Sequence, residues 1–142
     1  MAQYNQFAST PSYGDVPVKN YSGSTIAAAL AVIVDATNVV SPTSSNDAIG
    51  IAVPGAAGVP VVGVTLEDVA AGATGRSRTS GIVAVKCEGT IAAGTLVQAS
   101  VTSSKVGWAK ALTSAKAQIG MAVSSSTDGE LILVLLQPAN NA

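Results

Sequence analysis

The 142-residue chain contains no histidine and a single cysteine, Cys87. Without histidine it lacks the commonest general base and metal ligand, which excludes Ser-His-Asp and Cys-His catalysis. One cysteine allows neither an intramolecular disulfide nor a cysteine-based zinc site. Glu67 and Asp68 are the only adjacent carboxylates, and neighbours on a strand point to opposite faces. We therefore expect no enzyme, no metal and no cofactor, and we expect Cys87 to be a small buried hydrophobe.

Charge is also scarce, at 11% of the residues against about 25% in an average domain. Arg76 and Arg78 are the nearest approach to a basic block, so we expect no nucleic-acid partner. Residues 72–81 have the glycines of a phosphate-binding loop but no Gly-Lys-Ser/Thr. We interpret them as a turn leading into a strand, with both arginines on one exposed edge. A weakly charged surface suits close contact with another protein, although a secreted or Ser/Thr-rich domain has the same composition.

Long hydrophobic runs are missing. The longest, residues 26–34, has nine residues, whereas a membrane-spanning helix needs about 20. The run ends at Asp35 without a small-x-small cleavage pattern. We interpret it as a buried strand and expect neither a membrane partner nor a targeting segment.

Aromatic residues are few and lie mostly at one end of the chain. Only Trp108 lies outside the group near the N-terminus, which comprises Tyr4, Phe7, Tyr13 and Tyr21. The polar segment around them cannot form its own core, but its rings can anchor it to another surface. We predict an extended arm at 1–22 and a β domain at 23–142. An arm folded back on its own domain is the alternative.

From Ile26 onward, short apolar runs alternate with clusters of Gly, Pro, Ser, Thr and Asn, which is typical of β structure. Asp128-Gly129 is a strong hairpin signal. Frequent β-branched residues, Gly and Pro argue against long helices. We predict a mainly β fold, a small β-barrel with little helix. The expected strands are 30–34, 61–66, 81–88, 95–99, 106–109, 118–124 and 130–136.

Three short segments that look like strands contain a glycine: AIGIAV (48–53), VVGVTL (61–66) and QIGMAV (118–123). Side chains alternate between the faces of a strand, so each segment has a large apolar face and a small one. We assign the large face to the core, including Met121 and Val123. The small face contains Gly63 and Gly120. It allows either close approach of another backbone or a bulky side chain, as at a subunit interface, or sharp curvature of a barrel.

The segment ELILVLL (130–136) is apolar on both faces. A strand of this kind is expected to be covered on both sides. In so small a domain, the second cover would be an arm, another layer or a neighbouring subunit.

The run VVGVTLEDVAAGATGRSRTSGIVAVKCEGTIAAGTLVQAS, followed by QIGMAV and ELILVLL, resembles the head decoration (capsid cement) proteins of tailed bacteriophages. The resemblance covers about residues 60–136 and, more weakly, 14–40; the Gly/Pro-rich insert at 52–60 departs from it. It implies a β-tulip or β-barrel domain that forms homotrimers where capsid hexamers meet. It also implies an N-terminal arm reaching the shell, a location on the outer capsid surface of the virion, and synthesis in the bacterial host cytoplasm.

From these features we predict a decoration protein that binds the major capsid protein and itself and stabilises the expanded shell. Two alternatives stay open. One is a tail, fibre or surface-layer subunit, and the other is a small carbohydrate-binding domain that would use Trp108 as its platform. The predicted partner-interface residues are Tyr4, Phe7, Tyr13, Tyr21, Gly63, Gly120 and Trp108.

Overall fold

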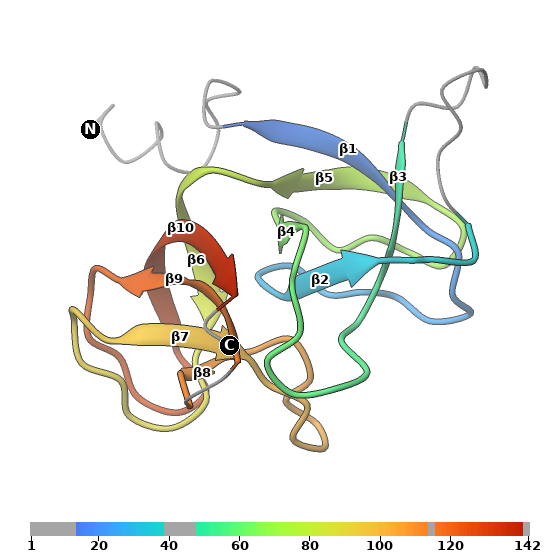
Figure 1. The fold of residues 1–142 in the computed structure, drawn as a ribbon. Helices are drawn as coiled ribbons and strands as arrows, with labels where there is room; N and C mark the ends of the chain where they lie inside the picture. Colours follow the sequence, from blue (N-terminus) through green and yellow to red (C-terminus); the bar gives the residue numbers. More distant parts are fainter. Residues whose placement is uncertain (1–13, 39–47, 114–115, 141–142) are drawn as a thin grey trace.

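The computed structural model describes residues 14–38, 48–113 and 116–140. These residues form strands and no helix, so none of them belongs to a helix that could cross a membrane. The strands form a closed five-stranded barrel and a second five-stranded sheet (Figure 1), which confirms the predicted mainly β, barrel-containing fold. The strands are β1 (Asp15–Asn20), β2 (Ala31–Val34), β3 (Ile49–Ala52), β4 (Gly63–Thr65), β5 (Thr74–Arg78), β6 (Gly81–Lys86), β7 (Leu96–Ala99), β8 (Ala109–Ala111), β9 (Ala117–Ala122) and β10 (Leu131–Asn140).

The barrel has the strand order β1-β3-β2-β4-β5 and closes because β1 pairs with both β3 and β5. Its interior is filled by four buried aliphatic side chains, Val18, Ile26, Val32 and Ile51. Alternation along β1 turns Val18 and Asn20 inward. The predicted arm is therefore wrong for residues 15–20, which are a barrel strand paired on both sides. Tyr4, Phe7 and Tyr13 lie outside the described residues.

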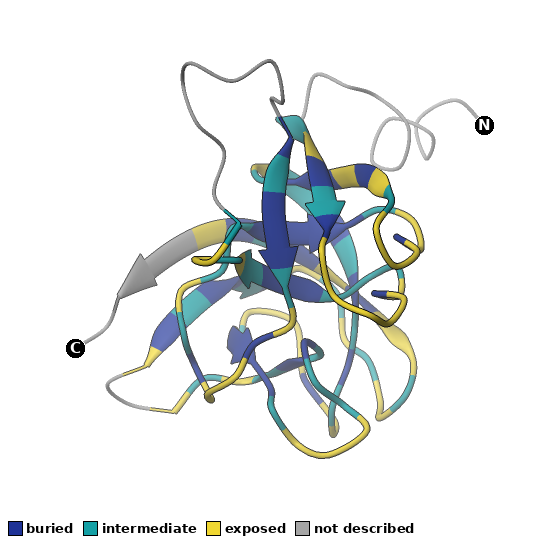
Figure 2. Ribbon diagram, turned by 90° about the vertical axis from the view of Figure 1, so that its right-hand side faces the viewer, coloured by how far each residue is buried: buried dark blue, intermediate teal, exposed yellow. Residues whose placement is uncertain are grey.

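The second sheet has the order β6-β10-β9-β7-β8, and Cys87 forms a parallel bridge to Ala109 that links its two ends. β9 and β10 pair antiparallel, as the Asp128-Gly129 turn predicts. The enclosed core includes fully buried Cys87, as expected, and Ala31 and Val64 of the barrel belong to the same cluster. The buried strand segments meet in the interior, while exposed residues lie mainly in the connecting loops (Figure 2). The barrel and the second sheet are thus joined by one cluster of buried hydrophobic residues.

Arg78 corrects a prediction from the sequence. It lies on β5 and its side chain is fully buried, whereas Arg76 is exposed beside Glu67. The Arg78 Nε lies 2.8 Å from Asp15 Oδ1, and its Nη1 donates to the Ile82 carbonyl at 3.1 Å. The two arginines therefore do not share an exposed edge. A carboxylate from β1 and a carbonyl from β6 accept the hydrogen bonds that allow the guanidinium to be buried.

Gly63 and Gly120 are also placed differently from the prediction, because both are buried inside the chain. A Cβ atom at Gly63 would lie 2.5 Å from the Arg78 carbonyl oxygen on the neighbouring strand. A Cβ at Gly120 would collide with the Leu135 carbonyl oxygen on β10. The close approach that requires glycine is thus made by neighbouring strands of the same chain, and neither glycine can form part of a partner interface.

Candidate interaction surface

One apolar surface is the outer side of the second sheet. On β10, Ile132, Val134 and Leu136 are buried, so the alternating residues face outward. Leu135 is opposite Met121 of β9 and Ile82 of β6, and Met121 is in turn opposite Leu96 of β7. One row of large apolar side chains therefore crosses four strands. We call the full set the outer sheet face: Ile82, Leu96, Met121, Val123, Leu131, Leu133 and Leu135.

Four members of the outer sheet face are more than a third exposed: Leu131 at 54%, Val123 at 39%, and Leu96 and Leu133 at 38%. No member carries a charge or a hydrogen-bonding side chain. Contiguous exposed apolar surface of this kind often marks an interaction site. The described part of this chain therefore supplies only part of the predicted cover for the second face of segment 130–136, and leaves Leu131 and Leu133 exposed.

The same register corrects the assignment of faces in QIGMAV. Gly120 is opposite Leu136 and Val97, and Ala122 is opposite Val134, so these small residues lie on the core side. Met121 and Val123 face outward instead of filling the core, whereas Ile119 is buried as predicted. Leu136 and Val134 of β10 and Val97 of β7 already fill the interior of this curved sheet. The positions opposite them on β9 therefore have room only for glycine and alanine.

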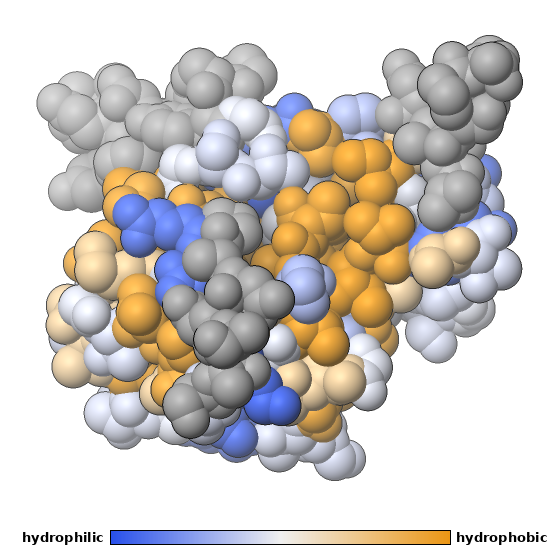
Figure 3. Space-filling model, in the orientation of Figure 1, coloured by the Kyte–Doolittle hydropathy of each residue, from blue (hydrophilic) through white to orange (hydrophobic). Residues whose placement is uncertain are grey.

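A second apolar surface lies on the barrel, where a groove of about 490 Å³ opens beside β2. Its lining consists of Ile33, Val34, Val59, Pro60, Val61 and Val62. In Figure 3 hydrophobic surface lies to the right of centre, over β2 and the segment between β3 and β4. Part of this lining comes from the Gly/Pro-rich insert. We call this lining the β2 groove.

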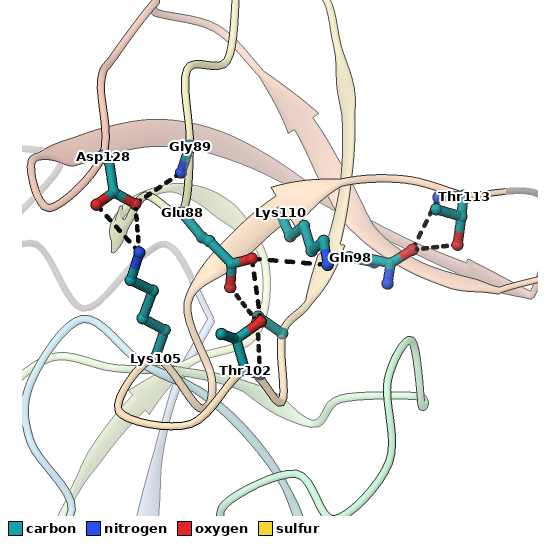
Figure 4. Close-up of polar contacts among 9 residues, drawn as sticks. Glu88, Gly89, Gln98, Thr102, Lys105, Lys110, Thr113 and Asp128 are labelled. Carbon is teal, nitrogen blue, oxygen red and sulfur yellow. Dashed lines mark hydrogen bonds and ion pairs between the residues drawn. The ribbon is translucent and has the colours of Figure 1, made fainter.

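Polar side chains form separate hydrogen-bonded groups on the second sheet, around Glu88, Asp128 and Gln98 (Figure 4), which we call together the polar cluster. The Glu88 carboxylate accepts hydrogen bonds from Ser100 and Thr102 and lies 3.6 Å from Lys110 Nζ. Partial burial raises the pKa of Glu88, but these hydrogen bonds and the nearby lysines outweigh it and hold the pKa below its usual value. Each carboxylate has a cationic neighbour. The cluster is therefore internally neutralised and offers no excess charge to a ligand.

Asp128 lies at the other side of this cluster. Its Oδ1 accepts hydrogen bonds from the Gly89 amide at 2.8 Å and from Lys105 Nζ at 2.9 Å. These bonds to the charged form lower the pKa of Asp128. Within residues 14–38, 48–113 and 116–140, no three His, Cys, Asp or Glu side chains are grouped so that they could hold a metal ion.

The remaining predicted interface residues are Trp108 and Tyr21, and both rings are close to lysine side chains. Lys86 and Lys105 place their ammonium groups 5.7 and 5.8 Å from the centroid of the half-buried Trp108 ring. Tyr21 is 38% exposed and has Lys19 at 4.9 Å. The structure does not bring either ring into the outer sheet face. Lysine ammonium groups over the indole also leave less of it available as a flat sugar platform.

No protein-family model matches the chain, and no curated protein matches it. Its fold is similar to the crystal structure of the N base of head fibre gp8.5 from bacteriophage phi29, with a TM-score of 0.62. The similarity covers 89% of this chain and 95% of that chain, at 16% sequence identity. At this identity the likeness concerns the fold.

Proposed function

We propose that this chain is a structural protein of a bacteriophage head, located on the outer surface of the shell, where it binds the major capsid protein. The observation that carries the proposal is the outer sheet face, seven uncharged apolar side chains of which four are more than a third exposed in the described chain. The fold likeness to a head fibre base supports the same setting. In this proposal the outer sheet face packs against the shell.

The physical role of such binding is to stabilise the assembled shell. A protein that binds only the expanded shell stabilises each site by RT ln(1 + [L]/Kd), about 2.7 kcal/mol at 100-fold saturation. An interface with few charges loses little hydration of polar groups on forming, which suits permanent attachment. We also propose that the protein assembles as a homotrimer. The mass of the isolated protein in solution tests this, with three chain masses expected.

A second candidate function is the base of a head fibre. It is favoured by one observation, that the similar structure is itself a head fibre base and is covered over 95% of its length. Electron microscopy of virions separates the two functions. A decoration protein covers many equivalent positions of the shell without a projection, whereas a fibre base is continuous with a longer appendage.

The experiment measures binding of purified protein to heads that lack it, from the phage that encodes it. We expect the double variant Leu131→Gln and Leu133→Gln to weaken binding by about 10- to 100-fold, since each side chain loses part of a burial contribution of about 1.5–3 kcal/mol. The matched control is Val34→Gln with Val53→Gln, two comparably exposed residues of the barrel. Unchanged binding of the first variant would exclude the outer sheet face, and weakened binding of the control alone would assign the contact to the region of the β2 groove.

A further inference from the structure

β6 forms one edge of the second sheet, and part of its main chain has no partner within the described residues. The Cys87 amide donates to Glu130 on the β10 side, whereas the Lys86 amide donates away from β10 to the Ala29 carbonyl at 2.9 Å. Successive residues of a strand direct their main-chain groups to opposite sides. Ile82 and Ala84 therefore direct theirs away from β10, as Lys86 does.

The outward carbonyl of Ile82 accepts a hydrogen bond from Arg78. Among residues 14–38, 48–113 and 116–140, the Ile82 amide, the Ala84 amide and the Ala84 carbonyl have no main-chain partner. Two donors and one acceptor thus lie along one side of a six-residue strand. Such an edge is a template for one more strand.

The described chain begins beside this edge. The Gly14 carbonyl accepts two hydrogen bonds from Thr79, from its amide at 3.1 Å and its hydroxyl at 2.6 Å. This contact continues the antiparallel pairing of Asp15 with Arg78 by one residue, and β6 starts two residues after Thr79. The chain preceding Gly14 is therefore attached next to the start of the unpaired edge.

We propose that residues 1–13 of this chain add to the edge of β6 as an extra antiparallel strand. Thirteen residues can span up to about 43 Å, and β6 is about 20 Å long, so the segment is long enough. It contains no charged residue and three of the five aromatic residues of the protein. Alternate side chains of the added strand would lie next to Ile82 and enlarge the outer sheet face.

The chemistry of the segment limits its alignment. Pro11 has no amide hydrogen and can occupy an edge strand only where its nitrogen faces away from the ladder. Thr10 and Ser12 would then direct their main-chain groups toward β6, where they can accept from the Ile82 and Ala84 amides and donate to the Ala84 carbonyl. Attachment at Gly14 favours the segment of the same chain over that of a neighbouring copy, because intramolecular pairing has the higher effective concentration.

Amide hydrogen exchange on the free protein tests the proposal without any phage particle, so its outcome is independent of the proposed function. In the full chain, the Ile82 and Ala84 amides are expected to exchange at least about tenfold more slowly than in a variant lacking residues 1–13. The Lys86 amide, bonded to Ala29, is the internal control and keeps its protection in both proteins. Fast exchange of Ile82 and Ala84 in the full chain would overturn the proposal, as would protection that depends on protein concentration, which would make a second copy the occupant.

A second variant, Ala84→Pro, removes one outward donor and leaves the β10 ladder intact. We expect it to accelerate exchange at Ile82 and chymotrypsin cleavage at Phe7 and Tyr13, with an unchanged cleavage pattern in the rest of the chain. Cleavage at Phe7 and Tyr13 that is equally fast in the unmodified protein and in this variant would contradict the added strand.

Discussion

The barrel and the second sheet have the same number of strands but different interiors. The barrel half buries a complete ion pair, Arg78 with Asp15, and the amide of Asn20, which makes hydrogen bonds to Ser22, Ser24 and Val69. The core cluster of the second sheet is mainly aliphatic, its ion pairs lie at the surface, and its buried polar side chains, Gln98 and Ser100, are uncharged. The barrel thus depends on a few directional contacts, whereas the second sheet depends on side-chain packing.

The exteriors of the two halves differ as well. The second sheet has an outer face with apolar residues on four neighbouring strands, in register. The barrel has apolar surface mainly beside β2 and in the segment that follows β3. An outward-facing array of aligned side chains can contact a large partner over a broad area, while a groove accepts a narrower segment. This difference is the reason for assigning the shell contact to the second sheet.

The strongest test of the comparison is Asp15→Asn, which leaves the Arg78 charge buried without its carboxylate. Removing one partner of a buried pair costs about 3–5 kcal/mol of unfolding free energy. The free energy of unfolding is measured by urea denaturation followed by circular dichroism. We expect this loss to be larger than the losses caused by Gly120→Ala and Glu67→Gln.

Glu67→Gln is the matched control. It breaks the Arg76–Glu67 pair, whose N–O distance is 3.2 Å and whose side chains are 51% and 46% exposed. Exposed pairs contribute about 0–1 kcal/mol. Equal losses for the two substitutions would mean that the barrel does not depend on its buried pair.

Gly120→Ala tests the packing of the second sheet and should have an intermediate effect. The new methyl group meets the main chain of β10, which cannot move aside without disturbing the ladder. Overpacking of this kind costs about 1–3 kcal/mol. Gly55→Ala is the control, because a Cβ there has no neighbour within 4 Å. If both variants unfold at the same urea concentration, close approach of strands is not the reason for glycine at position 120.

Much of the fold could be predicted from apolar alternation and turn residues. The expected strands from 30–34 to 130–136 all overlap observed ones, and the β9–β10 hairpin is confirmed. The strands β1 and β5 were missed. β5 reads TGRSR and has no apolar residue, because its buried side chains are Ser77 and Arg78. A strand whose inward residue is a paired arginine has no alternation signal, since its stability comes from a carboxylate 63 residues away in the chain.

The candidate surface could be predicted only in part. The two apolar faces of segment 130–136 were visible in the sequence, but alternation has the same period on either face and does not say which one is inside. The neighbouring strand decides which face is inside: Leu136 is opposite Gly120 and Val134 is opposite Ala122. The glycine pattern predicted close approach but left open whether a partner or the curvature of the barrel required it, because pairing within the chain is not encoded in a single strand.

The pH dependence of stability should show the smallest difference between the barrel and the second sheet. Partial burial raises the pKa of Glu88, but its hydrogen bonds and the nearby lysines outweigh this and hold the pKa below the usual value. The Gly89 amide and Lys105 lower the pKa of Asp128. A carboxylate with a lowered pKa in the folded state stabilises the protein above its unfolded pKa, and this contribution is lost as the pH falls through the folded pKa. We therefore expect the urea midpoint to fall between about pH 5 and pH 3, and to fall less in Glu88→Gln. Glu130→Gln, which removes an exposed charge outside the polar cluster, controls for net charge. A pH dependence in Glu88→Gln as steep as that of the unmodified protein would show that Glu88 contributes nothing to the acid stability of the protein.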